Sequence, residues 1–243
     1  MSKVFGYELR RLLLNKFFFG LLAVTMLYSY LVMDSEIILG VANTAPFSGW
    51  SYGVFLASVL PLLLITLLFF VSFLYSQNER KVRTITDTTP ADPAQYRLVR
   101  CASILVGFLI ISLAVIAVGL IFYAVIFRFT GFGSLFVPIL FVLLPAMLFV
   151  LGVGLVLGEA HPALVYALVP VILFSAFLPL PDSVNLLGTS FFTHYPATLG
   201  VVEPAFSVPL FVWIIRAFYA AVGIALTMFS VTRARKPGAA TAA

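Results

Sequence analysis

Long uninterrupted runs of apolar residues constrain this chain more than any other feature of its sequence. A helix that crosses the hydrocarbon core of a bilayer needs about 20 residues at a rise of about 1.5 Å each. Runs of about this length cover residues 17–33, 52–75, 101–127, 134–158, 162–180 and 207–231. Because a bilayer core has no water, each segment must satisfy its own backbone hydrogen bonds, and runs without alternation favour helices over barrel strands. The predicted fold class is an all-α integral membrane protein with six transmembrane helices.

The composition agrees with a membrane protein. Apolar residues make up 63% of the 243 and charged residues 9%, and the mean hydropathy is +1.15. A soluble domain is about half apolar and about a quarter charged, so the excess here must face lipid. No repeat or linker divides the chain, so we expect one membrane domain, 1–243. A cleaved signal peptide is the alternative for the first run, but its length and the lack of a small-residue cleavage site oppose it.

Lysine and arginine are distributed unevenly over the connecting segments. Twelve of the fourteen lie in residues 2–16, in 76–100 and in the tail after 231. Six crossings place these three segments on the same side of the membrane. Since basic residues accumulate on the cytoplasmic side, both termini are predicted to be cytoplasmic. This topology accounts for the net charge of +5, and no nucleic-acid partner is expected.

Several chemical signatures are missing from the sequence. It has no phosphate-binding loop of the G-x-x-x-x-G-K-[ST] type, no H-E-x-x-H zinc motif and no G-x-S-x-G nucleophile motif. We therefore expect no cofactor or metal on this chain and no enzymatic activity. None of the nine carboxylates lies deep in a run, which argues against an ion-coupled carrier and against an intramembrane enzyme that uses paired acids.

The N-terminal segment 2–16 has the pattern of a basic amphipathic helix. Phe5, Leu9 and Leu12 fall on one helical face, whereas Arg10 and Arg11 fall on others. Such a helix lies in the membrane interface and leads into the first run. The alternative is an ordinary positively charged flank of that run.

The loop 76–100 is the largest cytoplasmic feature of the predicted topology. Ser76 with Glu79 fits a capping box, and Asp92–Pro93 with Gln95 fits a second helix start. The loop therefore predicts a short helix near 77–87, a turn, and a second helix that rises into the third run. It could present a docking surface to a cytoplasmic partner, or it could be a solvated connector held against anionic lipid.

The segment 181–206 is half apolar and interrupted by glycine and proline. It is too broken to span, so we expect re-entrant half-helices on the outer side before the last run. Trp50 and Tyr52, on the same side, suit an interfacial aromatic belt.

The order of these elements resembles the membrane subunits of ABC transporters, in the six-helix type-2 export permease family. The resemblance rests on the helix at 2–16, the loop between the second and third runs, and the broken segment before the last run. In that loop the family commonly has an acidic–basic pair, a Thr-Pro step, an aromatic residue and a basic residue. The similar positions here are Glu79–Arg80, Thr89–Pro90, Tyr96 and Arg100.

The resemblance implies a permease of an ATP-driven exporter in a plasma membrane, here the bacterial cytoplasmic membrane. Its partners would be two ATPase subunits, which bind ATP and Mg²⁺, and a second permease copy or paralogue, besides membrane lipid. The segment 2–16 would be the elbow helix, through Phe5, Leu9, Arg10, Arg11 and Leu12. The coupling helix would contact the ATPase through Glu79, Arg80, Val82, Ile85, Thr89 and Pro90.

Arg216 is the charge deepest in a predicted span. A buried arginine costs at least about 2.5 kcal/mol on insertion scales, so it must face a partner, water or substrate. One interpretation is snorkelling, or pairing with outer-loop carbonyls or Glu203; the other is that Arg216 lines a translocation route. Gly154 and Gly158 form a small-xxx-small pair that serves packing within the chain or between two copies.

Two other function classes stay open. A secondary carrier or channel would transport without an ATPase. A membrane-embedded assembly factor or enzyme would show a polar cluster facing a cavity.

Overall fold

The computed structural model describes residues 2–41, 44–76, 93–178, 181 and 185–233. All regular elements within these residues are helices. They are α1 (Ser2–Leu13), α2 (Lys16–Ser35), η1 (Ile37–Leu39), α3 (Gly49–Phe73), α5 (Pro93–Ile126), η2 (Phe132–Leu135), α6 (Phe136–Ala160), α7 (Pro162–Phe177), α8 (Thr189–Thr198) and α9 (Leu210–Arg233). The predicted coupling helix near 77–87 falls outside the described residues, as do Glu79, Arg80, Val82, Ile85, Thr89 and Pro90.

Five segments in the described part of the chain are long and apolar enough to cross a membrane. They are Lys16–Leu39, Gly49–Phe73, Pro93–Ile126, Phe132–Ala160 and Leu210–Arg233. The chain is thus an all-helical, multi-pass membrane protein. The run at 162–180 corresponds to α7, whose 16 residues reach only about 24 Å at the α-helical rise.

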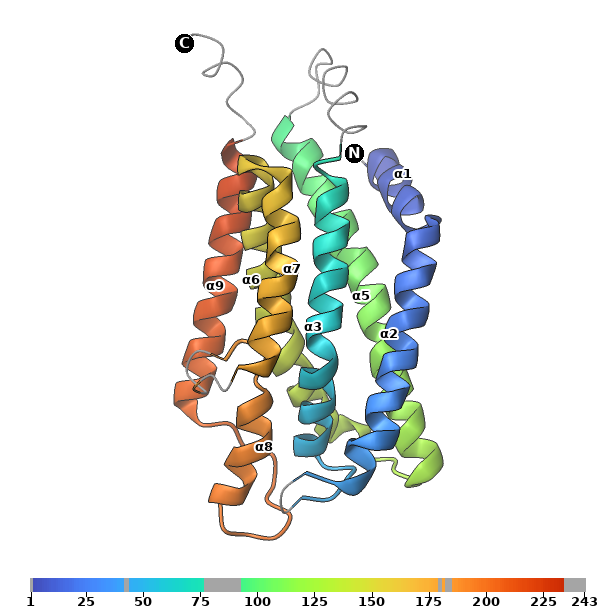
Figure 1. Ribbon diagram of the computed structural model, residues 1–243, viewed down its shortest axis with the longest axis vertical. Coiled ribbons are helices and arrows are strands. Elements are labelled where there is room, and N and C mark those ends of the chain that lie inside the picture. The colour runs from blue at the N-terminus through green and yellow to red at the C-terminus, as the bar shows by residue number, and fades with distance from the viewer. Residues whose placement is uncertain (1, 42–43, 77–92, 179–180, 182–184, 234–243) are drawn as a thin grey trace.

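The helix α7 ends early for a local reason. Leu178 is extended, with φ −79° and ψ 132°, and a proline follows it in the sequence. Clash with a proline ring disfavours the helical region for the preceding residue. Among the described residues that follow Leu178, helical structure resumes at α8, which lies beyond the end of α7 (Figure 1). One of the half-helices predicted in 181–206 is present in the described residues, as α8. Residues 200–209 are not helical.

The second predicted span, α3, is the central helix of the bundle. Most of its side chains are buried, although Phe69 is exposed; such extensive burial is expected for a helix without a polar face. α2 and α5 pack against one side of α3, and α6, α7 and α8 pack against the other (Figure 1). α9 packs mainly on α6, at the edge of the bundle.

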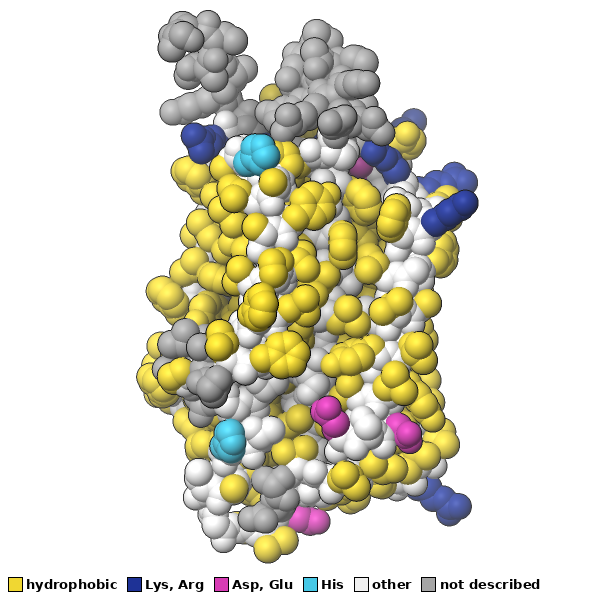
Figure 2. All heavy atoms as spheres, viewed as in Figure 1, with side chains coloured by type: hydrophobic (Ala, Val, Ile, Leu, Met, Phe, Trp, Pro, Cys, Tyr) yellow, Lys and Arg dark blue, Asp and Glu magenta, His cyan; other side chains and the backbone are white. Residues whose placement is uncertain are grey.

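The two ends of the bundle differ in their side chains. α1, the start of α5 and the end of α9 lie together, and we call this the α1 end; α8 lies at the opposite end (Figure 1). Figure 2 shows apolar side chains over the middle of the visible face, with most of the lysine and arginine side chains at the α1 end and one at the opposite end. Exposed leucine, phenylalanine and valine side chains of α2, α7 and α9 make up much of this apolar surface.

Glycines allow the closest helix contacts. A methyl group on Gly223 of α9 would overlap the main chain of Leu148 in α6, and one on Gly152 would overlap the carbonyl oxygen of Gly223. Gly154 and Gly158 face Leu68 and Tyr75, in and just after α3. The small-xxx-small pair of the fourth run therefore serves packing within the chain.

The aromatic residues at the opposite end are buried. Trp50 and Tyr52 have no exposed surface, so the prediction that they form an interfacial belt is wrong. The indole Nε1 of Trp50 donates a hydrogen bond to the carbonyl of Pro204 at 3.0 Å, and its ring lies 4.8 Å from that of Phe206. The chain before α9 and the rings of α8 cover this part of α3, which the sequence pattern of α3 alone does not indicate.

Candidate functional site

The helix α1 is anchored to α5 at the α1 end of the bundle. The Glu8 carboxylate accepts a hydrogen bond from the Tyr96 hydroxyl at 3.2 Å, and it lies 3.9 Å from Nε of Arg100. Its side chain is only 12% exposed. Leu12 rests on the bare backbone of Gly107 in α5. The amphipathic helix predicted at 2–16 is therefore held to the bundle by both polar and apolar contacts.

The two faces of α1 match the predicted pattern. Phe5, Leu9 and Leu12 are half-buried, whereas Arg10 and Arg11 are exposed. Nη1 of Arg11 lies 4.0 Å from Oε2 of Glu8. The basic side of the helix thus faces away from the bundle, where it is open to lipid headgroups or to a partner protein.

A polar cluster joins three helices at the same end, and we call Arg97, Glu159 and Ser230 the polar clamp. Nη1 of Arg97, near the start of α5, donates to Oε1 of Glu159 at the end of α6. It also donates to the main-chain carbonyl of Ser230 in α9 at 2.7 Å, and the Ser230 hydroxyl donates to the same Glu159 oxygen. The two charged side chains are 16% and 14% exposed.

These contacts hold the chain on both sides of residues 77–92. Before that segment, the Tyr75 hydroxyl donates to the carbonyl of Leu155 in α6 at 2.7 Å. After it, Tyr96 and Arg97 bind Glu8 and Glu159. The described residues on either side of residues 77–92 are thus linked by hydrogen bonds to α1, α6 and α9.

A second polar group lies away from the α1 end, in the connection between α7 and α8. The Asn185 side-chain oxygen accepts hydrogen bonds from the amides of Leu187 and Gly188, both at 3.0 Å. Its amide nitrogen donates to the Ser190 hydroxyl at 2.6 Å. Gly188, at φ +78°, has the left-handed conformation that favours glycine. Non-helical backbone at membrane depth requires such internal partners.

Arg216 completes this second group. It is the seventh residue of α9 and is 3% exposed. Its Nη1 donates to the carbonyl of Leu186, and its guanidinium carbon lies 4.9 Å from the ring centre of Phe141. Of the interpretations weighed from the sequence, pairing with a carbonyl of the segment 181–206 is observed, and the described carboxylates form no salt bridge with Arg216.

The described residues contain no group of three or more His, Cys, Asp or Glu side chains that could hold a metal ion. His161 caps α7, its Nδ1 accepting from the amide of Ala163 at 3.2 Å, and His194 is exposed on α8. In the described structure, the polar clamp and the group around Asn185 and Arg216 act as links between segments of the bundle.

Sequence reasoning missed the polar clamp and the role of Glu8. The sequence pattern gives Arg97 a part in topology alone, and it names no partner for Glu159, which directly follows the run at 134–158. A usable signal was present. Both side chains lie at the end of a predicted span, on the same side of the membrane. Their opposite charges are therefore at the same depth in the bilayer, where charged groups favour pairing.

Comparison of the chain with protein families, with curated proteins and with solved structures finds no match.

Proposed function

We propose that this chain is the membrane-spanning permease subunit of an ATP-driven exporter, with the ATPase on separate chains. The observation that carries the proposal is the anchoring of α1 to α5 beside residues 77–92. Glu8, Tyr96 and Arg100 join the proposed elbow helix to the helix that follows the proposed coupling segment. A motor that docked there would contact both elements at once.

The proposal includes six crossings with both termini in the cytoplasm. The basic side chains at the α1 end support a cytoplasmic location for that end (Figure 2). α7 stops short of a full crossing, and α8 continues from it toward the opposite end (Figure 1). We take α7 and α8 together as the fifth crossing, interrupted at residues 178–188.

The polar clamp supports a path for the mechanical step. Arg97 lies in the first turns of α5, directly after the proposed coupling segment, and binds α6 and α9 through Glu159 and Ser230. Closure of two ATPase subunits on ATP and Mg²⁺ would move the start of α5, and the clamp would pass this movement to both helices. A second permease copy or paralogue would complete the transporter.

Co-purification tests the partner. The full chain, expressed in a bacterium that carries its natural gene neighbourhood, is expected to retain a P-loop ATPase through mild detergent extraction. Scrambling residues 79–90 should abolish retention, because the proposed docking residues lie there. Scrambling the tail 234–243, on the same proposed side, is the control and should leave retention unchanged. If both scrambled variants lose the ATPase, or if neither does, the result would contradict the proposal.

Arg216 gives a second prediction. Arg216→Gln removes a charged hydrogen-bond donor from Leu186, so the free energy of unfolding in mixed micelles should fall by about 1.5–3 kcal/mol. Arg128→Gln, at an exposed turn, is the matched control and should stay within about 0.5 kcal/mol. If Arg216 also lines the translocation route, transport per assembled protein falls in Arg216→Gln alone. Equal unfolding energies for the two variants would show that the Leu186 contact contributes nothing.

A secondary carrier or channel is the second candidate. It is favoured by one observation, the interrupted helix next to a cavity, since ion and substrate sites of such carriers often lie at broken helices. Transport by the purified chain in vesicles without any ATPase would establish it. Transport that requires an added ATPase subunit and ATP would exclude it.

A further inference from the structure

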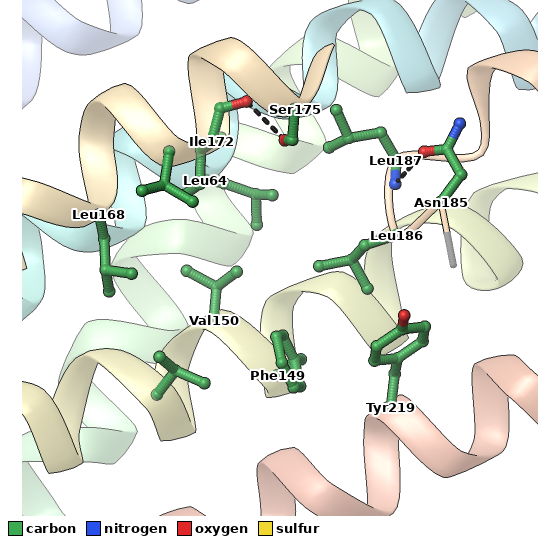
Figure 3. Close-up of a pocket in the computed structure, with 12 residues that line it drawn as sticks. Leu64, Phe149, Val150, Leu168, Ile172, Ser175, Asn185, Leu186, Leu187 and Tyr219 are labelled. Atoms are coloured by element: carbon green, nitrogen blue, oxygen red, sulfur yellow. Dashed lines mark hydrogen bonds between the residues drawn. The ribbon is translucent and has the colours of Figure 1, made fainter. Parts of the chain in front are cut away.

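A cavity of about 250 Å³ lies beside the interruption between α7 and α8 (Figure 3). α6 contributes Phe149 and Val150, α7 contributes Leu168 and Ile172, and α9 contributes Tyr219. Leu64 of the central helix α3 also lines it. Leu186 and Leu187 close the cavity on the side of the interruption (Figure 3).

The cavity wall has almost no polar atom to offer a ligand. The Ser175 hydroxyl donates to the carbonyl of Ile172 at 2.7 Å. The Asn185 side chain is occupied by Leu187, Gly188 and Ser190, and Tyr219 is not without a partner either. Water needs two to four polar partners to stay in a cavity. This cavity therefore favours hydrocarbon over water.

The cavity opens toward the bilayer between α7 and α9. Both helices pack on α6, but they make little contact with each other. Val171, at the cavity wall, is 60% exposed. Phe174, next to the lining residue Ser175 in α7, is 69% exposed, and Phe218, next to the lining residue Tyr219 in α9, is 64% exposed. In a membrane the medium outside this opening is the acyl region of the lipids.

We infer that this cavity binds one acyl chain of a bilayer amphiphile, which enters sideways between α7 and α9. The inference does not depend on the proposed transport function. An apolar cavity of about 150 Å³ already binds benzene, so 250 Å³ accommodates a length of hydrocarbon chain. From Leu168 to Ser175 the wall follows α7 for about 10 Å at the helical rise.

The physical basis of binding is packing. Transfer from lipid to protein gains little hydrophobic free energy, because lipid tails are as apolar as leucine. An empty cavity, however, deprives its lining of dispersion contacts, and a bound chain restores them. The site therefore selects a flexible chain that fits the slot, and it binds from the high concentration of chains in the bilayer.

Photo-crosslinking in vesicles tests the site. The full chain is reconstituted with phosphatidylcholine whose acyl chain carries a diazirine, and the labelled peptides are identified by mass spectrometry. Labelling is expected at Phe149, Leu168 and Tyr219 above the level on the lipid face of α2. Val153→Phe, which fills the cavity, should reduce this labelling about tenfold, because a close-packed site has no room for a chain.

Matched variants keep the test decisive. Val171→Phe obstructs the exposed opening and is used if Val153→Phe does not fold; it should reduce the labelling in the same way. Val24→Phe makes the same change on α2, where Val24 is 54% exposed, and should leave the labelling of the cavity unchanged. Labelling at the cavity that equals the α2 level, or that persists in both filled variants, would overturn the inference.

Discussion

Replacing Gly223 by alanine is expected to lower the free energy of unfolding by about 3 kcal/mol, at the upper end of the usual cost of overpacking. Gly223 lies where α9 crosses α6. The added methyl group would overlap the carbonyl group of Leu148 and the amide nitrogen of Phe149. These are main-chain atoms inside a helix, so no rotamer change relieves the overlap and the two helices must move apart.

Gly20 is the matched control for this substitution. It lies within α2, is exposed, and has no atom within 4 Å of the position that a methyl group would take. Gly20→Ala is expected to stabilise the protein by about 0.5–1 kcal/mol, because alanine is the better helix former. The unfolding of both variants is measured by denaturant titration in mixed micelles. Similar effects at the two positions would show that α6 and α9 do not meet at Gly223.

The second large effect is expected at the polar clamp. Arg97→Met leaves the Glu159 carboxylate largely buried without its cationic partner, and such a change costs about 3–5 kcal/mol. The Ser230 carbonyl loses a 2.7 Å hydrogen bond at the same time. Because the clamp joins α5, α6 and α9, hydrogen exchange at the last turns of α6 and α9 should also become faster in Arg97→Met.

A double-mutant cycle separates the pair from its surroundings. Arg97→Met, Glu159→Met and the double variant are expected to give a coupling energy of at least about 1 kcal/mol, as for contacting residues in one network. Arg10→Met makes the same substitution on the exposed face of α1 and should change the unfolding energy by less than about 0.5 kcal/mol. Additive effects of the two clamp substitutions would contradict the described ion pair.

Much of the helix pattern follows from the sequence for a simple reason. The run at 52–75 corresponds to α3, Gly49–Phe73, and the run at 17–33 lies within α2, Lys16–Ser35. Segment length alone predicts these helices, since a backbone in lipid has no other partners. Local chemistry also predicts a helix from Pro93 onward, because Asp92–Pro93 with Gln95 is a typical helix N-terminus, and residues 93–126 are helical as α5.

The interruption in the fifth run was only partly predictable. Proline near 178–181 indicates a break, but 162–180 is as apolar as the other runs and was read as one crossing. The structure ends α7 at Phe177 and begins α8 at Thr189. Where the chain turns depends on Asn185, Gly188 and Arg216, and the last of these reaches the Leu186 carbonyl from another helix.

The residue pattern alone establishes a set of membrane helices with an amphipathic basic helix before the first of them. Which helix is central follows from packing in three dimensions. In an apolar 18-residue stretch of α3, 83% of the residues are buried. In the corresponding stretch of α9, which is also strongly apolar, 17% are buried. Inside a bilayer, side chains that face lipid and side chains that are buried between helices are both apolar, so hydropathy does not distinguish them. The partners of Glu8, Glu159 and Arg216 follow in the same way from segments that are distant in the sequence and neighbours in the fold.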